Sequence, residues 1–343
     1  MSLKIGIVGL PNVGKSTLFQ ALTKKFVDRS NYPFATIDPN VGVVQVPDHR
    51  LNKLAELSKS KKIIPNVIEF VDIAGLVRGA SVGEGLGNQF LSYIGEVDAI
   101  IELVRDFENN DVIHVEGAPD PARDIEILET ELALKDIETC EKLLPRFEKE
   151  TKADPTAGGK KALERLAFLK QIIALLKSTG KISDLNIIPL AQELNLLISK
   201  PILYCFNSSH EQSQIKNKAG ISLDIKHEFE VSELDEKDMQ ELGVGSKLGE
   251  LIRAAYQLLG LITFFTTGED ETRAWAIPIG SKAPRAGRAI HSDFENKFIR
   301  ASVISWEELL KSKSYAAARE LGILRTEGKD YIVKDGDVIE FRI

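Results

Sequence analysis

The sequence contains few cysteines and no long apolar run. Cys140 and Cys205 are its two cysteines, and their wide separation excludes a disulfide scaffold. No apolar stretch approaches the roughly 20 residues that a membrane-spanning helix needs, so we expect no membrane partner. The N-terminus continues directly into an apolar strand without the pattern of a signal peptide. We therefore expect a cytoplasmic protein.

Basic residues are also in the minority. Lysine and arginine number 44 against 51 aspartates and glutamates, which gives a net charge of -7. Such a chain has no global attraction for nucleic acid, and we expect no DNA specificity. Any RNA partner must meet a local basic surface. With 343 residues, of which 43% are hydrophobic and 28% charged, the chain is long enough for two or three globular domains.

Residues 9–16 read Gly-Leu-Pro-Asn-Val-Gly-Lys-Ser, after an apolar run at 3–8 and before a helical pattern at 17–22. This order of strand, glycine-rich loop and helix predicts a phosphate-binding loop, because backbone N–H groups and the positive helix end attract phosphate. The alternative is a glycine turn that binds nothing. We expect nucleotide contacts from Asn12, Val13, Gly14, Lys15, Ser16 and Thr17.

Two further segments complete a predicted magnesium and nucleotide site. Lys15 is expected to reach the β and γ phosphates, and the Ser16 hydroxyl to hold Mg²⁺. Thr36 lies in a polar segment, residues 31–42, where switch proteins close over the γ phosphate, and it is expected to be a second magnesium ligand. An apolar strand at 66–72 ends in Asp72, which can hold Mg²⁺, and the N–H of Gly75 can bond the γ phosphate.

The residue after Gly75 bears on hydrolysis. A Ras-like enzyme would carry a water-orienting glutamine there, whereas this chain has Leu76. Slow turnover is therefore expected, unless another group holds the water. Residues 79–88 are too rich in glycine for regular structure and predict a second switch.

These motifs resemble the YchF subfamily of the Obg-like P-loop proteins. The resemblance is carried by residues 9–16, 31–42, 72–88 and 107–117, and it extends over essentially the whole chain. It implies a hydrophobic residue in place of the catalytic glutamine, a preference for ATP over GTP, and a catalytic role for His114. A loop histidine considered alone would be more typical of a solvent-exposed residue.

From residue 121 to about 197 the pattern becomes helical. Apolar side chains recur every three or four residues in two runs, Ile125 to Phe147 and Leu163 to Leu176, with a turn at 154–159 between them. This predicts an antiparallel helical hairpin, and the apolar stripe is expected to form the seam between its helices rather than a groove for a partner. The resemblance implies a coiled-coil-like arm inserted here into the nucleotide domain.

The core is expected to resume with a strand at 201–207. GTPases end this strand in Asn-Lys-x-Asp, whose aspartate pairs with guanine, but here His210 stands in the place of that aspartate. Neutral histidine has one acceptor nitrogen and cannot make the paired contact. Asn207 can still serve adenine N6 and N7. Residues 227–233 are expected to form a strand that leads to a base-side loop.

The last part of the chain, from about 261, is locally basic. Six basic residues stand between 273 and 300 against two acidic ones: Arg273, Lys282, Arg285, Arg288, Lys297 and Arg300. Strands are predicted at 274–279, 298–304, 331–333 and 338–341, around a helix at 306–311. This segment resembles a TGS domain, a β-grasp module of translation-linked proteins. We expect ribosome or structured-RNA contact, with a merely solvated basic rim as the alternative.

The predicted fold class is therefore α/β. A P-loop nucleotide-binding domain (1–120 and 198–260) carries an inserted helical hairpin (121–197) and a C-terminal TGS-like β-grasp domain (261–343). The predicted function is a Mg²⁺-dependent ATPase switch that regulates translation or ribosomes, with K⁺ held at Asn12 by analogy with other switch proteins. The alternatives are a GTP-using switch, a nucleotide-sensing ribosome-binding or RNA-binding protein with incidental hydrolysis, and a metabolic phosphotransferase.

Overall fold

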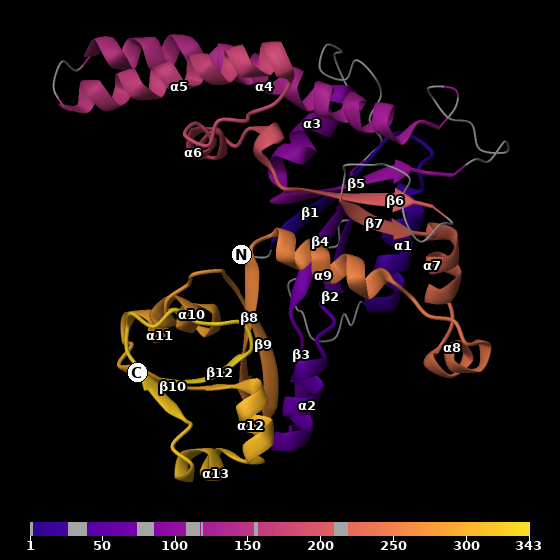
Figure 1. Ribbon diagram of the computed structural model, residues 1–343, viewed down its shortest axis with the longest axis vertical. Helices are drawn as coiled ribbons and strands as arrows, with labels where there is room; N and C mark the ends of the chain where they lie inside the picture. The colour runs from indigo at the N-terminus through magenta and orange to yellow at the C-terminus, as the bar shows by residue number, and fades with distance from the viewer. Residues whose placement is uncertain are drawn as a thin grey trace.

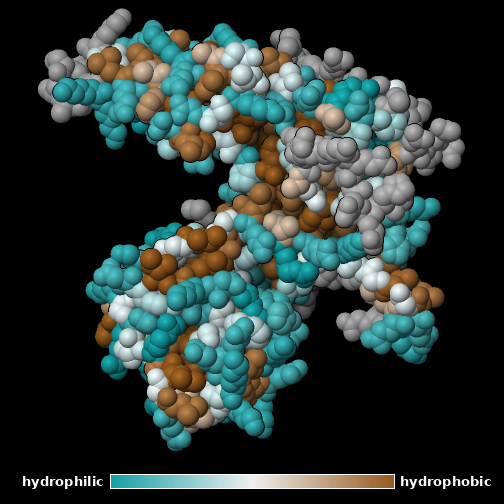
Figure 2. Space-filling model, viewed as in Figure 1, coloured by the Kyte–Doolittle hydropathy of each residue, from teal (hydrophilic) through white to brown (hydrophobic). Residues whose placement is uncertain are grey.

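The computed structural model contains two six-stranded sheets and a projecting pair of long helices (Figure 1). It describes residues 3–26, 40–73, 86–107, 117, 119–153, 157–208 and 219–343. The arm and the part built on the second sheet stand on either side of an open hollow (Figure 2). Within these ranges, no helix combines the length and apolar character that crossing a membrane requires.

The first sheet carries the nucleotide motifs. Its strand order is β2-β4-β1-β5-β6-β7, and the strands are β1 (Lys4–Val8), β2 (Val41–Gln45), β4 (Val67–Asp72), β5 (Ala99–Arg105), β6 (Ile202–Asn207) and β7 (Gly220–Leu223). All neighbours pair in parallel except β2, which is antiparallel to β4. Strand β5 is buried along its whole length, as expected for a central parallel strand covered on both faces.

Helices close the core of this sheet. Apolar side chains of α1 (Lys15–Phe26), α3 (Leu86–Glu96) and α9 (Leu248–Leu258) join the buried strand residues in one cluster. The remaining helices here are α7 (Ile225–Ser232) and α8 (Glu236–Leu242). The predicted α/β class is confirmed.

The strand predicted at 227–233 is wrong, because residues 227–232 belong to α7 and Glu233 is its C-cap. The side chain of Asp224 caps the helix by accepting from His227 N, 3.0 Å away. Ile225, Glu228 and Val231 recur at three-residue steps and are buried. This helical spacing of buried positions outweighs the β-branched and aromatic content that suggested a strand.

The helical hairpin is formed by α4 (Pro121–Ala153) and α5 (Ala157–Thr179), followed by the short helices α6 (Ile188–Glu193) and η1 (Leu197–Ser199). Its seam buries Cys140, Phe147, Leu169, Ile172 and Leu176. The predicted stripe is only partly a seam, however. Ile125, Leu128 and Leu132 pack toward the first sheet instead, and Leu163 is 58% exposed.

The second sheet has the order β11-β10-β12-β8-β9-β3. It contains β8 (Leu261–Thr267), β9 (Glu271–Pro278), β10 (Arg300–Ser305), β11 (Arg325–Glu327), β12 (Asp337–Arg342) and β3 (Lys62–Ile64). Its helices are α10 (Ala283–Ile290), α11 (Ser292–Asn296), α12 (Trp306–Ser312) and α13 (Tyr315–Glu320). The predicted helix at 306–311 is confirmed as α12, which Ser305 and Glu308 begin with a capping box. The strand predicted at 331–333 is a single bridge between Ile332 and Lys282.

Strand β3 comes from the N-terminal part of the chain. It pairs in parallel with β9, so that Ile63 stands opposite Thr272. Helix α2 (His49–Ser58), just before it, buries Leu51 and Leu54 in the same cluster as Phe265. Residues 49–64 therefore pack with the C-terminal segment (261–343), although they lie within the range that the sequence assigns to the nucleotide domain. The exact domain boundaries stay a prediction.

Candidate nucleotide-binding site

The phosphate-binding loop joins β1 to α1 at the end of the first sheet where the carboxyl ends of its parallel strands lie. A Cβ built on Gly9, where φ is 151°, would lie 2.3 Å from the carbonyl oxygen of Leu103 on β5. One on Gly14, where φ is 106°, would lie 3.0 Å from Asn207 Nδ2. Side chains larger than glycine would therefore push the loop away from β5 and β6.

Lys15 begins α1 and is 8% exposed. Its Nζ donates to the carbonyl oxygen of Leu10, 2.9 Å away, which closes the loop. Burial lowers the pKa of the Lys15 ammonium, and the charge of Asp72 partly offsets that shift. A buried ammonium has three donors, so this loop can offer positive charge to a phosphate.

Ser16 and Asp72 meet across 56 residues of sequence. Ser16 Oγ donates to Asp72 Oδ2 over 3.0 Å. The contact arises because β1 and β4 are parallel neighbours, with Ile7 opposite Asp72, so that both strands end at the same edge.

Hydroxyl and carboxylate oxygens are ligands that Mg²⁺ accepts, so Ser16 and Asp72 fit that ion. In the part of the chain that the structure describes, no group of three or more histidine, cysteine or acidic side chains could hold a metal. Magnesium at this edge would therefore need further ligands beyond Ser16 and Asp72, and P-loop sites take several of them from water and phosphate oxygens.

Asn207 ties the loop to the far strands. Its Nδ2 donates to the carbonyl oxygen of Val13 over 3.0 Å, and its Oδ1 accepts from Ile225 N over 3.2 Å. One donor hydrogen and one lone pair of the amide are left for other partners. The partner Ile225 carries no sequence signal for such a role, and only the structure reveals it.

A cavity of about 390 Å³ lies beside these residues. Lys15, Ser16 and Asp72 line it, and it extends to Tyr93 and Glu96 of α3. The described part of the predicted site thus borders open space at the carboxyl ends of β1 and β4, where ligands of open α/β sheets bind.

The remaining predicted residues are distributed as follows. Thr17 follows Ser16 in the first turn of α1, and Asn12 adopts a left-handed backbone conformation with φ 62°. Thr36, Gly75 and His114 lie outside the described residues, as do Leu76 and His210.

Comparison with known proteins decides the family. The ribosome-binding ATPase YchF of Escherichia coli O157:H7 is 47% identical, with 99% of each chain covered. The ribosome-binding ATPase YchF of Bacillus subtilis is also 47% identical, over the whole of this chain and 99% of the relative. The chain belongs to the YchF family.

Family models and a solved structure agree with this assignment. Residues 4–139 match a family described as 50S ribosome-binding GTPase, and residues 261–343 match the C-terminal model of YchF GTPases, described as a protein of unknown function. The solved structure of the Schizosaccharomyces pombe YchF GTPase has a TM-score of 0.87 and 36% identity, over 99% of this chain and 98% of that one. The resemblance read from the sequence motifs is thereby confirmed.

The bacterial alignments also show a difference in length. They extend over 365 and 367 positions, more than the 343 residues of this chain, so these relatives of the YchF family contain residues that it lacks.

Proposed function

We infer that this chain is an ATPase that works on the ribosome, as the names of its bacterial relatives state for them. The observation that carries this inference is the meeting of Lys15, Ser16 and Asp72 at one edge of the first sheet. A buried ammonium, a hydroxyl and a carboxylate are the groups that a magnesium nucleotide requires. A ribosomal partner implies work in the cytoplasm.

The test is Lys15→Ala. Loss of the ammonium should reduce nucleotide binding and ATP hydrolysis by about 10²-fold or more, because the charge acts directly on the phosphates. The fold should survive, since the partner of Lys15 in the loop is a carbonyl oxygen. Lys24→Ala is the matched control: Lys24 lies on the same helix, 45% exposed, and pairs with Glu233. Wild-type turnover in Lys15→Ala would contradict the proposal.

For magnesium, we propose Ser16, Thr36 and Asp72 as the protein ligands. The ion would neutralise phosphate charge while the γ-phosphoryl group is transferred to water. K⁺ at Asn12 is a further proposal, and replacing K⁺ by Na⁺ should then lower turnover.

For hydrolysis, we propose that His114 positions the attacking water in place of the missing glutamine, with the N–H of Gly75 on the γ phosphate. Turnover should be slow, because Leu76 cannot orient water. Ala in place of His114 should slow hydrolysis without weakening ATP binding. An unchanged rate would make His114 a bystander.

The choice of base is a separate question, because the names of the relatives differ. The bacterial proteins are called ATPases and the Schizosaccharomyces pombe protein a GTPase. We propose that ATP binds better than GTP here, because His210 cannot accept both donors of guanine. Titration with non-hydrolysable analogues of both nucleotides separates this proposal from a GTP-using switch.

The partner role distinguishes regulation from incidental hydrolysis. A regulator should bind ribosomes with different affinities in its ATP-analogue and ADP states, which sedimentation with ribosomes measures. Equal affinity would favour a nucleotide-sensing protein whose hydrolysis is incidental. Free phosphate released without any acceptor would argue against a phosphotransferase.

A further inference from the structure

Residues 46–66 form an excursion from the first sheet into the second. The chain leaves at the end of β2 and returns at the start of β4, and between them α2 and β3 pack with the C-terminal segment. We call residues 46–66 the excursion. It connects two neighbouring strands of the nucleotide sheet, although most of its own contacts are with the C-terminal segment.

The excursion is firmly held in the second sheet. Leu54 and Phe265 are fully buried in one cluster. The N–H groups of Lys61 and Lys62 donate to the carbonyl oxygens of Glu269 and Asp270, at 3.0 and 3.2 Å. Since β3 completes the sheet edge, a movement of the excursion must move the C-terminal segment with it.

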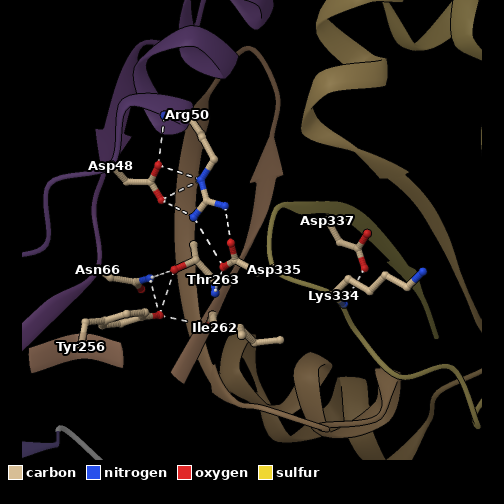
Figure 3. Close-up of polar contacts among 9 residues, drawn as sticks. All are labelled: Asp48, Arg50, Asn66, Tyr256, Ile262, Thr263, Lys334, Asp335 and Asp337. Carbon is tan, nitrogen blue, oxygen red and sulfur yellow. Dashed lines mark hydrogen bonds and ion pairs between the residues drawn. The ribbon is translucent and has the colours of Figure 1, made fainter. Parts of the chain in front are cut away.

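An arginine joins the start of the excursion to the C-terminal segment. Arg50 contacts Asp48 at 2.7 Å and Asp335 at 2.5 Å (Figure 3). Burial lowers the pKa of the Arg50 guanidinium, but the hydrogen bonds and charges of the two aspartates outweigh it, and the pKa lies above its ordinary value. The Arg50 side chain is 17% exposed and the Asp335 side chain 49%, so the pair is buried on the arginine side and borders solvent on the aspartate side.

The loop that carries Asp335 is shaped for this contact. Gly336 has φ 87°, and a Cβ built on it would lie 2.7 Å from Trp306 Cδ1 and 3.3 Å from Arg50 Nη1. Only glycine brings the loop this close without strain. Asp335 Oδ1 also accepts from the backbone N–H of Thr263, 2.8 Å away.

Asn66, at the end of the excursion, also contacts Thr263. Asn66 Nδ2 donates to Thr263 Oγ1 over 3.1 Å and to the hydroxyl of Tyr256 over 3.3 Å (Figure 3). Thr263 therefore contacts groups tied to both ends of the excursion: Asp335 through its backbone and Asn66 through its side chain.

We call the boundary between the excursion and the C-terminal segment the seam. Strand β4 connects this seam to the phosphate site. It runs from Val67, next to Asn66, to Asp72, which accepts from Ser16. Five steps of about 3.4 Å place its first and last residues about 17 Å apart. Strand β2 is bonded along β4, and Asp72 N donates to the carbonyl oxygen of Asn40 at 2.9 Å.

A cavity of about 780 Å³ lies along the seam. Asp48, Arg50, Tyr256 and Asp335 line it. The Asp335 side chain is 49% exposed there, so solvent reaches the aspartate side of the Arg50–Asp335 pair. A partly exposed charge pair between two elements suits a coupling role.

We propose that the excursion transmits the nucleotide state of the Ser16–Asp72 edge to the C-terminal segment, with Arg50–Asp335 as the pair that couples them. This inference rests on the proposed nucleotide site and adds its regulation. Coupling is reciprocal, so a partner on the C-terminal segment changes nucleotide affinity by the same factor as nucleotide changes partner affinity.

The experiment is hydrogen exchange of the Lys61 and Lys62 amides, which bond across the seam, with and without a saturating non-hydrolysable ATP analogue. In the wild type, the analogue should change these exchange rates by about fivefold or more. In Asp335→Asn, which keeps an acceptor for Thr263 N but loses the charge, the change should disappear while the analogue still saturates the site. Asp330→Asn is the control, because Asp330 pairs with Lys282 inside the C-terminal segment and should leave the wild-type response intact.

Each other outcome overturns the inference. A saturated wild-type site with no change at these amides would mean that the seam does not respond, while the proposed function stands. An unchanged response in Asp335→Asn would remove the pair from the coupling. Failure of the wild type to bind the analogue at all would contradict the proposed function, and this inference with it.

Discussion

Asn207 Nδ2 donates to the carbonyl oxygen of Val13 over 3.0 Å, which ties the end of β6 to the phosphate loop. The same amide accepts from Ile225 N, at the start of α7. One side chain therefore holds three segments of the site in register.

The first prediction is that Asn207→Ala loosens the phosphate loop without changing base preference. Both bonds are partly buried, so the free energy of unfolding should fall by about 1 to 3 kcal/mol. Affinities for ATP and GTP analogues should fall by the same factor, because the variant loses loop support. Denaturant unfolding and nucleotide titration measure the two effects.

Asn186→Ala is a suitable control, because the Asn186 amide bonds Asp184 on the exposed surface of the arm region. A changed ratio of ATP to GTP affinity in Asn207→Ala would instead support the predicted direct contact of Asn207 with adenine.

The second prediction is that His210→Asp moves the nucleotide preference toward GTP. An aspartate there would accept two hydrogen bonds from guanine, and the shift should be part of the roughly 1 to 3 kcal/mol that an unmatched buried donor costs. His210→Ala removes the imidazole without adding an acceptor and should leave the preference for ATP. A wild-type preference for GTP would refute the reasoning from His210.

Much of the fold is predictable from sequence because its determinants are local. The strand at β1, the loop from Gly9 and the start of α1 follow from an apolar run, two glycines and a helical pattern over about two dozen residues. Strand β3 has no such signal. It contains three residues, Lys62–Ile64, and exists because Glu271–Arg273 offer a free edge some 200 residues later.

The residues of the site also divide into those that the sequence predicts and those that only the structure shows. Lys15, Ser16 and Asp72 could be predicted from motif spacing, because parallel strands bring their carboxyl ends to one edge. The partners of Asn207 could not, because Val13 and Ile225 contribute backbone groups that carry no residue identity. The pairing of Arg50 with Asp335 depends on the packing of α2 against the C-terminal segment, which no local pattern encodes.

The third prediction concerns pH and the base of the arm. Asp136 on α4 is 1% exposed and accepts from the N–H groups of Leu197 and Ile198, each 2.8 Å away. Burial raises the pKa of the Asp136 carboxyl to about 6, although these bonds and the charge of Lys200 act against the shift. Because this pKa is higher in the folded chain than in the unfolded one, its contribution to stability is full below about pH 4 and is lost as pH rises through 6.

The ionised carboxylate therefore costs up to roughly 3 kcal/mol above pH 6, a cost that Asp136→Asn does not share. Asn keeps one acceptor but turns an N–H₂ group toward a backbone donor, so it should destabilise the protein at pH 5. That penalty should be smaller at pH 7.5, by about 1.4 kcal/mol, because pH 5 lies one unit below the folded pKa. Denaturant unfolding of both proteins at both pH values tests this, and a penalty independent of pH would mean an ordinary pKa for Asp136.

The fourth prediction concerns the basic segment between 273 and 300. Three of its six cations are already paired: Lys282 with Asp330, Arg288 with Glu295 and Lys297 with Asp293. The guanidinium of Arg273 lies 4.0 Å from the ring centre of Trp275. Arg285 and Arg300 are exposed. Arg288 is therefore a weaker candidate for contact with an RNA partner, and Arg285 and Arg300 are better candidates for that contact.

We expect the whole protein to bind ribosomes with marked salt dependence, because neutralised phosphates release counterions. Arg285→Glu with Arg300→Glu should weaken that binding and reduce the salt slope by about one for each phosphate that is no longer neutralised. ATP affinity should not change, since neither residue borders the phosphate loop. Lys226→Glu with Lys237→Glu, on α7 and α8, makes the same change in net charge and serves as the control. Full ribosome association of the arginine variant at physiological salt would show that this segment is a solvated surface, and would direct attention to the arm formed by α4 and α5.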